Sequence, residues 1–194
     1  MVNVGKSERE HEFTLVLGGI SKLTSADEDA LFDAGCDDAT LVVRSGRVFI
    51  SFSRQSASMK DAIISAIKDV KKAIVGTEVV RIDECNLVSQ SDIARKIGRS
   101  RQLVHQYMTG VRGPGEFPAP ACEVTDGAPL WYWCEVANWL WKNDMIKEVD
   151  LRDAEEIDAI NTVLDMERSR KANPPLIEEV YRSITQCLEP GKTG

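Results

Sequence analysis

The sequence predicts an α+β protein in three parts: a βαββαβ domain over residues 1–83, a compact helical unit with short strands over residues 84–146, and two C-terminal helices over residues 147–194. β-Prone and helical segments alternate in the first part, and a glycine separates two short helices in the second. In the third part, apolar residues recur every three or four positions, which is typical of helices. The 194 residues, 43% of them hydrophobic and 28% charged, can bury more than one core.

The N-terminal part reads as four strands and two helices. Ser45 and Gly46 tolerate the positive φ angles of a tight hairpin turn between two β-prone runs. Ser58 opens a longer helix with one apolar stripe, and Gly76 stops it. The expected segments are a strand at 13–17, a helix from Thr24 or Ser25 through Phe32, strands at 39–44 and 47–53, a helix over 58–75 and a strand at 77–82. This order predicts a ferredoxin-like domain.

The segment from Ser89 to Met108 predicts a helix-turn-helix. Ser89 or Ser91 can cap a first helix, Gly98 supplies a left-handed turn, and Ser100 caps a second helix. The apolar residues of the second helix, Leu103, Val104 and Tyr107, are expected to face the core. Its outer face is expected to contact base edges in a major groove. These candidate base-contacting residues are Ser100, Arg101, Gln102, His105 and Gln106.

Positive charge is concentrated around this motif in an otherwise acidic chain. The window from Ser89 to Gly115 holds five basic residues and one acidic residue, which leaves −11 for the rest of a chain of net charge −7. Such segregation predicts one basic face, because local fields and not whole-chain charge govern nucleic-acid binding. The candidate phosphate-contacting residues are Ser91, Arg95, Lys96, Arg99 and Arg112.

Downstream of the helices, the chain continues with Gly110-Val-Arg-Gly-Pro-Gly-Glu-Phe-Pro-Ala-Pro120 and then Leu130-Trp-Tyr-Trp-Cys-Glu-Val-Ala-Asn-Trp-Leu140. Residues 87–143 therefore resemble the winged helix-turn-helix of the MerR superfamily, particularly its small AlpA and excisionase-like branch of phage-linked regulators. The resemblance implies an Arg-containing loop, a wing hairpin turning at Asp126 and Gly127, and a closing helix. It also implies a sequence-specific transcriptional regulator that binds double-stranded DNA.

The resemblance has limits. It does not cover the N-terminal part or the C-terminal helices, and Arg99 occupies a turn position that is often apolar in such motifs. No effector domain with metal-binding cysteines accompanies it, so metal sensing is not carried over. The four tryptophans are expected to pack the wing against the closing helix rather than to stack on bases. They are Trp131, Trp133, Trp139 and Trp141.

The C-terminal part predicts a helical hairpin that dimerises. A charged helix over 150–170 is followed by Asn173-Pro174-Pro175, where a second helix begins. Apolar residues of that second helix recur at three-and-four spacing and form the expected dimerisation seam. They are Ile177, Val180, Ile184 and Leu188. A homodimer on a two-fold DNA site is expected, because a single module buries little DNA surface.

Other functions are weighed against the same residues. With His11 and His105 as the only histidines and no nucleophile or phosphate-loop motif, no catalytic residue, cofactor or metal site is expected. No membrane span or secretory signal is expected, and five scattered cysteines suit a reducing cytoplasm. Two alternatives stay open: a DNA-bending recombination factor of the excisionase kind, and an antitoxin or other interaction protein. The N-terminal domain can take a protein partner or a small ligand. Gly18-Gly19 could hold such a ligand, but a lone Gly-Gly pair is usually a turn.

Overall fold

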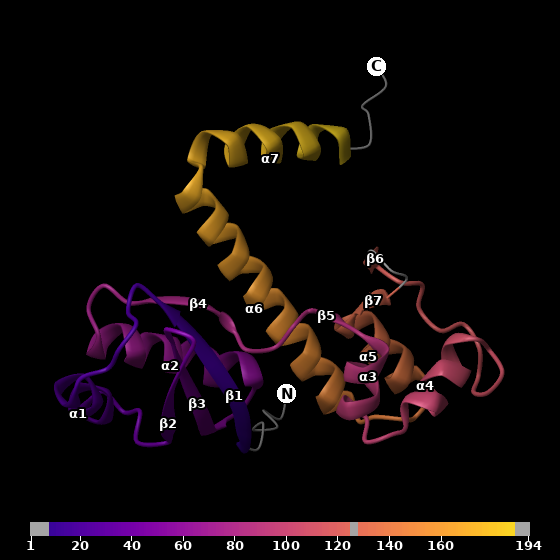
Figure 1. Cartoon of the computed structure of the whole chain (residues 1–194), viewed down its shortest axis with the longest axis horizontal. Coiled ribbons are helices and arrows are strands. Elements are labelled where there is room, and N and C mark those ends of the chain that lie inside the picture. The colour runs from indigo at the N-terminus through magenta and orange to yellow at the C-terminus, as the bar shows by residue number, and fades with distance from the viewer. Residues whose placement is uncertain (1–7, 125–127, 189–194) are drawn as a thin grey trace, which may run out of the picture.

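The computed structural model describes residues 8–124 and 128–188, and its class is α+β, as predicted. Figure 1 shows two groups of elements on either side of a long helix. The first group contains β1 (Arg9–Gly18), α1 (Ser25–Asp33), β2 (Ala39–Arg44), β3 (Arg47–Ser56), α2 (Met59–Ala73) and β4 (Glu78–Ile82). The second contains β5 (Leu87–Val88), α3 (Gln90–Lys96), α4 (Arg101–Met108), β6 (Cys122–Val124), β7 (Ala128–Tyr132) and α5 (Trp133–Lys142). Two further helices follow, α6 (Glu148–Ala172) and α7 (Pro174–Leu188).

The N-terminal sheet has the strand order β2-β3-β1-β4, and every neighbouring pair is antiparallel. Alternate residues of β3 point to the helices, so Val48, Ile50 and Phe52 are buried with α2. Ser45 and Gly46 have φ angles of 50° and 73°, which confirms the tight turn expected between β2 and β3. The apolar face of β3 and the β2–β3 turn could be predicted from the sequence because each depends on residues only a few positions apart.

Arg54, at the end of β3, is a buried cation that the sequence did not reveal. Its guanidinium donates to both carboxylate oxygens of Asp38, to Asp69 Oδ2 at 2.7 Å, to Ser65 Oγ and to the carbonyl of Gly35. These five hydrogen bonds tie the loop after α1 to α2. The two carboxylates together raise the pKa of Arg54 above its ordinary value and keep it charged despite burial.

Gly18 and Gly19 pack against the turn that precedes β4. A Cβ on Gly18 would lie 2.7 Å from Val80 Cγ2, and one on Gly19 would lie 3.0 Å from the Gly76 carbonyl oxygen. The hydroxyl of Thr77 donates to the carbonyl of Gly18 at 3.3 Å. This close packing around β4 therefore accounts for the glycine pair, which agrees with a turn and not with the alternative of a small-ligand site.

Helix α6 joins the two groups, which differs from the separate C-terminal part expected at 147–194. Its first turns pack Leu151 and Ala154 beside α5, while Ile157 is buried in the N-terminal core. Asn161, fully buried, accepts the N–H of Ile82 at 2.8 Å and donates to the carbonyl of Glu84 at 3.0 Å. The Asn161 side chain thus makes the backbone hydrogen bonds that a neighbouring strand would make at the end of β4. The apolar periodicity of the sequence does not predict this contact.

The predicted helical hairpin is wrong. α6 ends at Ala172 and α7 begins at Pro174, so a single residue, Asn173, connects them. Antiparallel helix pairs need connections of about two to five residues. α7 accordingly runs away from α6 in Figure 1, and none of its residues is buried. No helix in the described part of the chain combines the length and the apolar character needed to cross a membrane.

Candidate nucleic-acid interface

Helices α3 and α4 are short, and each begins at the serine that the sequence predicts. Ser89 caps α3: its hydroxyl accepts the N–H of Asp92, whose carboxylate in turn accepts the Ser89 N–H at 3.0 Å. Ser91 lies inside the first turn and is exposed. The hydrogen bonds from Ser89 lower the pKa of Asp92, the side-chain hydroxyl contributing most. Ser100 caps α4 by accepting the N–H of Leu103.

The turn between the two helices is a complete C-terminal capping motif. Gly98 has a φ of 61°, its N–H donates to the carbonyl of Arg95, and the N–H of Arg99 donates to the carbonyl of Ala94 at 2.9 Å. This is the Schellman pattern of hydrogen bonds, which favours glycine at the left-handed position. It redirects the chain within four residues, so that α4 crosses α3 closely.

The inner sides of the two helices meet a shared core. Ile93 and Ala94 of α3 and Val104 of α4 are buried together with Val136 and Leu140 of α5. The small side chain of Ala94 permits the close crossing. The helix pair is therefore held rigidly, and the outer face of α4 is left to solvent.

The structure places the expected base-contacting residues along the side of α4 that faces away from the core, from its N-cap to Gln106. Ser100, Arg101, Gln102 and His105 are exposed, and Gln106 is half-buried. We name these five residues the outer face of α4. Gln90, on α3, donates its side-chain amide to the Arg101 carbonyl at 2.8 Å and thereby fixes the first turn of α4. The surface carries amide, hydroxyl, imidazole and guanidinium groups on a rigid helix end, which are the groups that read base edges.

The expected phosphate-contacting cations divide into two classes. Arg95 pairs with Asp92 at 2.9 Å. Lys96 pairs with Glu84 at 2.9 Å, and its ammonium lies 5.0 Å from the ring centre of Trp133. Both cations are thus engaged within the protein. This engagement went unpredicted because Glu84 and Trp133 lie far from Lys96 in sequence.

Arg99 and Arg112 form the second class, and Arg101, a candidate base-contacting residue, has the same surroundings. All three are exposed, and across residues 8–124 and 128–188 no carboxylate lies within 4.0 Å of their side-chain nitrogens. Arg99 precedes α4 and Arg101 begins it, while Arg112 follows it in the loop. Three of the five basic residues in the window from Ser89 to Gly115 are therefore without an ion pair in the described part of the chain. These three arginines lie on or beside the outer face of α4.

The loop from Gly110 to Pro120 is pinned to the core by aromatic side chains. The indole N–H of Trp139 donates to the carbonyl of Gly115 at 2.9 Å, and that of Trp131 donates to the carbonyl of Pro118 at 3.0 Å. Phe117 packs edge-on against Trp139 at 4.9 Å between ring centres. These contacts fix the backbone of the loop that carries Arg112.

The tryptophans follow their predicted packing role in part. Trp131 and Trp139 are buried and Trp133 is half-buried, whereas Trp141 is 39% exposed, so the expectation for that residue is wrong. Trp141 occupies the last turn of α5, one turn after the buried Ala137, at the edge of the buried side of the helix. The apolar spacing of α5 identified its buried side, but it did not indicate how wide that side is.

A three-stranded antiparallel sheet, in the order β5-β7-β6, completes this part of the chain. β6 and β7 pair as expected for a hairpin, with Cys122 opposite Leu130. The expected turn at Asp126 and Gly127 lies outside the described residues. β5, which pairs with β7 through Val88 and Trp131, is too short to have been recognised from sequence pattern.

Comparisons with known proteins add no family assignment: the chain matches no protein-family model, no curated protein and no solved structure. Among the residues that the structure describes, no group of three or more His, Cys, Asp or Glu side chains is arranged to hold a metal ion.

Proposed function

We propose that this protein is a sequence-specific regulator of transcription that binds double-stranded DNA through a winged helix-turn-helix. The observation that carries the proposal is the outer face of α4, a rigid and polar helix end flanked by Arg99, Arg101 and Arg112. The four-residue turn, the close helix crossing and the following β6–β7 hairpin have the element order of such a domain. The resemblance to MerR-type regulators supports the same reading.

The proposed mechanism assigns α4 to the major groove. Arg101 and Gln102 carry the bidentate groups suited to guanine and adenine, and Gln106 and His105 lie one turn further along the same helix. Arg99 and Arg112 contact phosphates on either side and set the register without reading sequence. The pinned loop and the β6–β7 hairpin serve as the wing against the neighbouring backbone. Occupancy of a promoter then blocks or recruits polymerase.

The rest of the chain adjusts this binding. The strand order β2-β3-β1-β4 with two helices supports the assignment of a ferredoxin-like domain, which we propose binds a protein partner or a regulatory ligand. α7 is assigned to formation of a homodimer through its predicted seam, in which Val180, Ile184 and Leu188 are exposed and Ile177 is half-buried. A dimer presents two α4 helices to two half-sites and so multiplies a modest single-module affinity. We place this activity in the cytoplasm and assign the protein no catalytic step.

The experiment that tests the proposal is selection of genomic DNA fragments on the purified full chain, followed by fluorescence anisotropy over a range of salt concentrations. Affinity for a selected fragment is expected to fall steeply as salt rises, because phosphate contacts release counterions. Arg101→Ala is expected to weaken that fragment about 5- to 150-fold and to relax one base position. Arg112→Ala is expected to weaken all fragments alike.

The matched control is Arg47→Ala, which removes an exposed arginine from β3, outside the helix pair. Its affinity is expected to equal that of the wild type. Binding that is absent for every fragment, or that ignores salt, would overturn the proposal. Equal losses for Arg47→Ala and Arg101→Ala would show that only net charge matters and would remove α4 from sequence recognition.

A further inference from the structure

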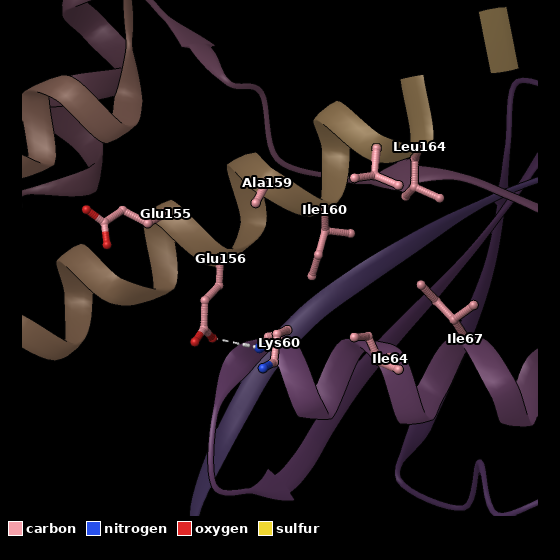
Figure 2. A pocket seen from close by; sticks show the side chains of 9 residues that line it. Lys60, Ile64, Ile67, Glu155, Glu156, Ala159, Ile160 and Leu164 are labelled. Atoms are coloured by element: carbon pink, nitrogen blue, oxygen red, sulfur yellow. Dashed lines mark hydrogen bonds between the residues drawn. The ribbon is translucent and has the colours of Figure 1, made fainter. Parts of the chain in front are cut away.

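An apolar groove lies between α2 and α6, on the side of the molecule away from the helix pair. It encloses about 460 Å³. Figure 2 shows Ile64 and Ile67 of α2 facing Ile160 and Leu164 of α6 across it. At its mouth Ile64 and Val163 are 38% and 60% exposed, a large apolar surface for a position between two helices. A soluble protein rarely leaves such a surface uncovered without a use.

α7 carries a second uncovered apolar surface. Leu176, Val180, Ile184 and Leu188 recur every four residues along one side and are between 42% and 75% exposed, with Tyr181 beside them. In a helix this spacing makes a continuous stripe. A 15-residue helix with such a stripe and no buried residue gains its stability from packing against something else.

The chain cannot bring these two surfaces together within one molecule. Asn173 alone separates α6 from α7, its side chain accepts the N–H of Leu176, and Pro174 and Pro175 lock the following φ angles. An ion pair from Arg170 to Glu178, at 3.4 Å, joins the second turn of α7 to the end of α6. A short, stiff link of this kind is the condition under which an element packs on a second copy of the chain.

The two surfaces also match in the position of their charges. With Ile184 placed between Ile64 and Ile67, Glu179 lies roughly 7.5 Å along the helix, at the level of Lys71, one turn beyond Ile67. Its neighbour Glu178 is already paired with Arg170 of its own chain. Toward the C-terminal end of α7, the same placement brings Leu188 near Lys60, which lies about one turn before Ile64 on α2. Lys60 then faces the C-terminal end of α7, where a cation is favourable.

We propose that the groove between α2 and α6 receives α7 from a second copy of this chain, and that the second copy receives α7 in return. This reciprocal exchange gives a closed two-fold dimer with two identical interfaces. The inference rests on the homodimer of the proposed function and names its acceptor site. It does not depend on DNA binding, since the dimer forms without DNA.

The first test is sedimentation equilibrium of the full chain, without DNA, for two single variants. Val163→Asp changes an exposed groove residue, and Ile184→Asp changes the centre of the α7 stripe. The wild type is expected to be a dimer, and each variant is expected to dissociate at least 100-fold more readily. Lys68→Asp and Gln186→Asp, on exposed positions outside the groove and opposite the α7 stripe, are the matched controls and are expected to remain dimeric.

Mixing the two variants separates this arrangement from direct pairing of α7 with α7. A mixture of Val163→Asp and Ile184→Asp retains one intact interface, formed by the unaltered α7 and the unaltered groove, so heterodimers are expected to reappear. A groove variant that stays dimeric, or a mixture that stays monomeric, would overturn the exchange. An unchanged near-ultraviolet circular dichroism spectrum, which reports the buried Trp131 and Trp139 away from the groove, confirms that the fold of each variant is intact.

Lengthening the link provides an independent test. Insertion of Gly-Ser-Gly-Ser between Asn173 and Pro174 gives a connection long enough for α7 to fold back onto its own groove. The inserted chain is expected to be a monomer whose α7 resists limited proteolysis, and addition of Val163→Asp is expected to expose α7 to cleavage. A monomeric wild type would overturn the inference. A dimer that binds no DNA would contradict only the proposed function.

Discussion

Replacement of Arg54 by methionine removes the cation that joins the loop after α1 to α2. The guanidinium makes five hydrogen bonds of 2.7–3.0 Å and is 10% exposed, while the carboxylates of Asp38 and Asp69 are 24% and 30% exposed. Removing one partner of a buried ion pair lowers the free energy of unfolding by about 3–5 kcal/mol. Because both carboxylates keep some water, we expect a loss near the lower limit, about 3 kcal/mol.

Urea unfolding followed by circular dichroism measures this loss. At a slope of about 2–3 kcal/mol per molar urea, the midpoint is expected to fall by about 1 M or more. Asp38→Asn is expected to destabilise the wild type but to restore part of the loss in the Arg54→Met background, since it removes one abandoned charge. Arg47→Met, an exposed arginine of the same strand, is expected to change stability by less than about 0.5 kcal/mol. A loss below about 1 kcal/mol for Arg54→Met would show that this buried ion pair does not hold the loop after α1 to α2.

Three further predictions concern single positions. Burial raises the pKa of the Cys36 thiol to about 11, so mass-spectrometric mapping of thiol labelling at pH 8 is expected to find it unmodified in the native chain; labelling there would contradict its burial. Ser89→Ala is expected to lower the free energy of unfolding by about 1 kcal/mol at pH 7. The folded-state pKa of Asp92 is lowered, so its ionised carboxylate stabilises the folded chain fully above about pH 4. That stabilisation is lost as the pH falls through the folded-state pKa. The Ser89→Ala difference should therefore shrink in acid, and a constant difference between pH 7 and 3 in urea unfolding would be evidence against this. Gly113→Ala brings a Cβ to 2.8 Å from the Tyr107 ring at a φ of +92°; we expect altered near-ultraviolet circular dichroism and weaker DNA binding, whereas an unchanged spectrum would show that the loop is not pinned.

The elements that sequence pattern predicted well are those whose determinants lie within a few residues. Ser45-Gly46 makes a turn by its own φ preferences, and Ser58, Ser89 and Ser100 cap helices by accepting N–H groups three residues ahead. The apolar face of β3 follows from strict alternation. The members of the outer face of α4 were predicted for the same reason, because a helix of known phase assigns each residue a side.

The errors lie where a distant residue decides the outcome. Lys96 belongs to the basic window by sequence, yet Glu84 and Trp133 engage it. The apolar spacing of the C-terminal helices is real, but a hairpin also needs a connection, and one residue is too short to make it. Apolar periodicity predicts which side of a helix is apolar, but it does not predict which other surface packs against that side.

For the candidate DNA interface, the sequence alone determined the two helices, their caps, the glycine turn and the identity of the residues on the outer face of α4, because these follow from local hydrogen bonding and helical phase. Only the tertiary structure decided which cations remain available, that aromatic rings pin the loop carrying Arg112, and that α6 ties both cores together through Asn161. Those outcomes depend on contacts between residues far apart in the chain. Such contacts arise from the packing of whole elements, which no local pattern encodes.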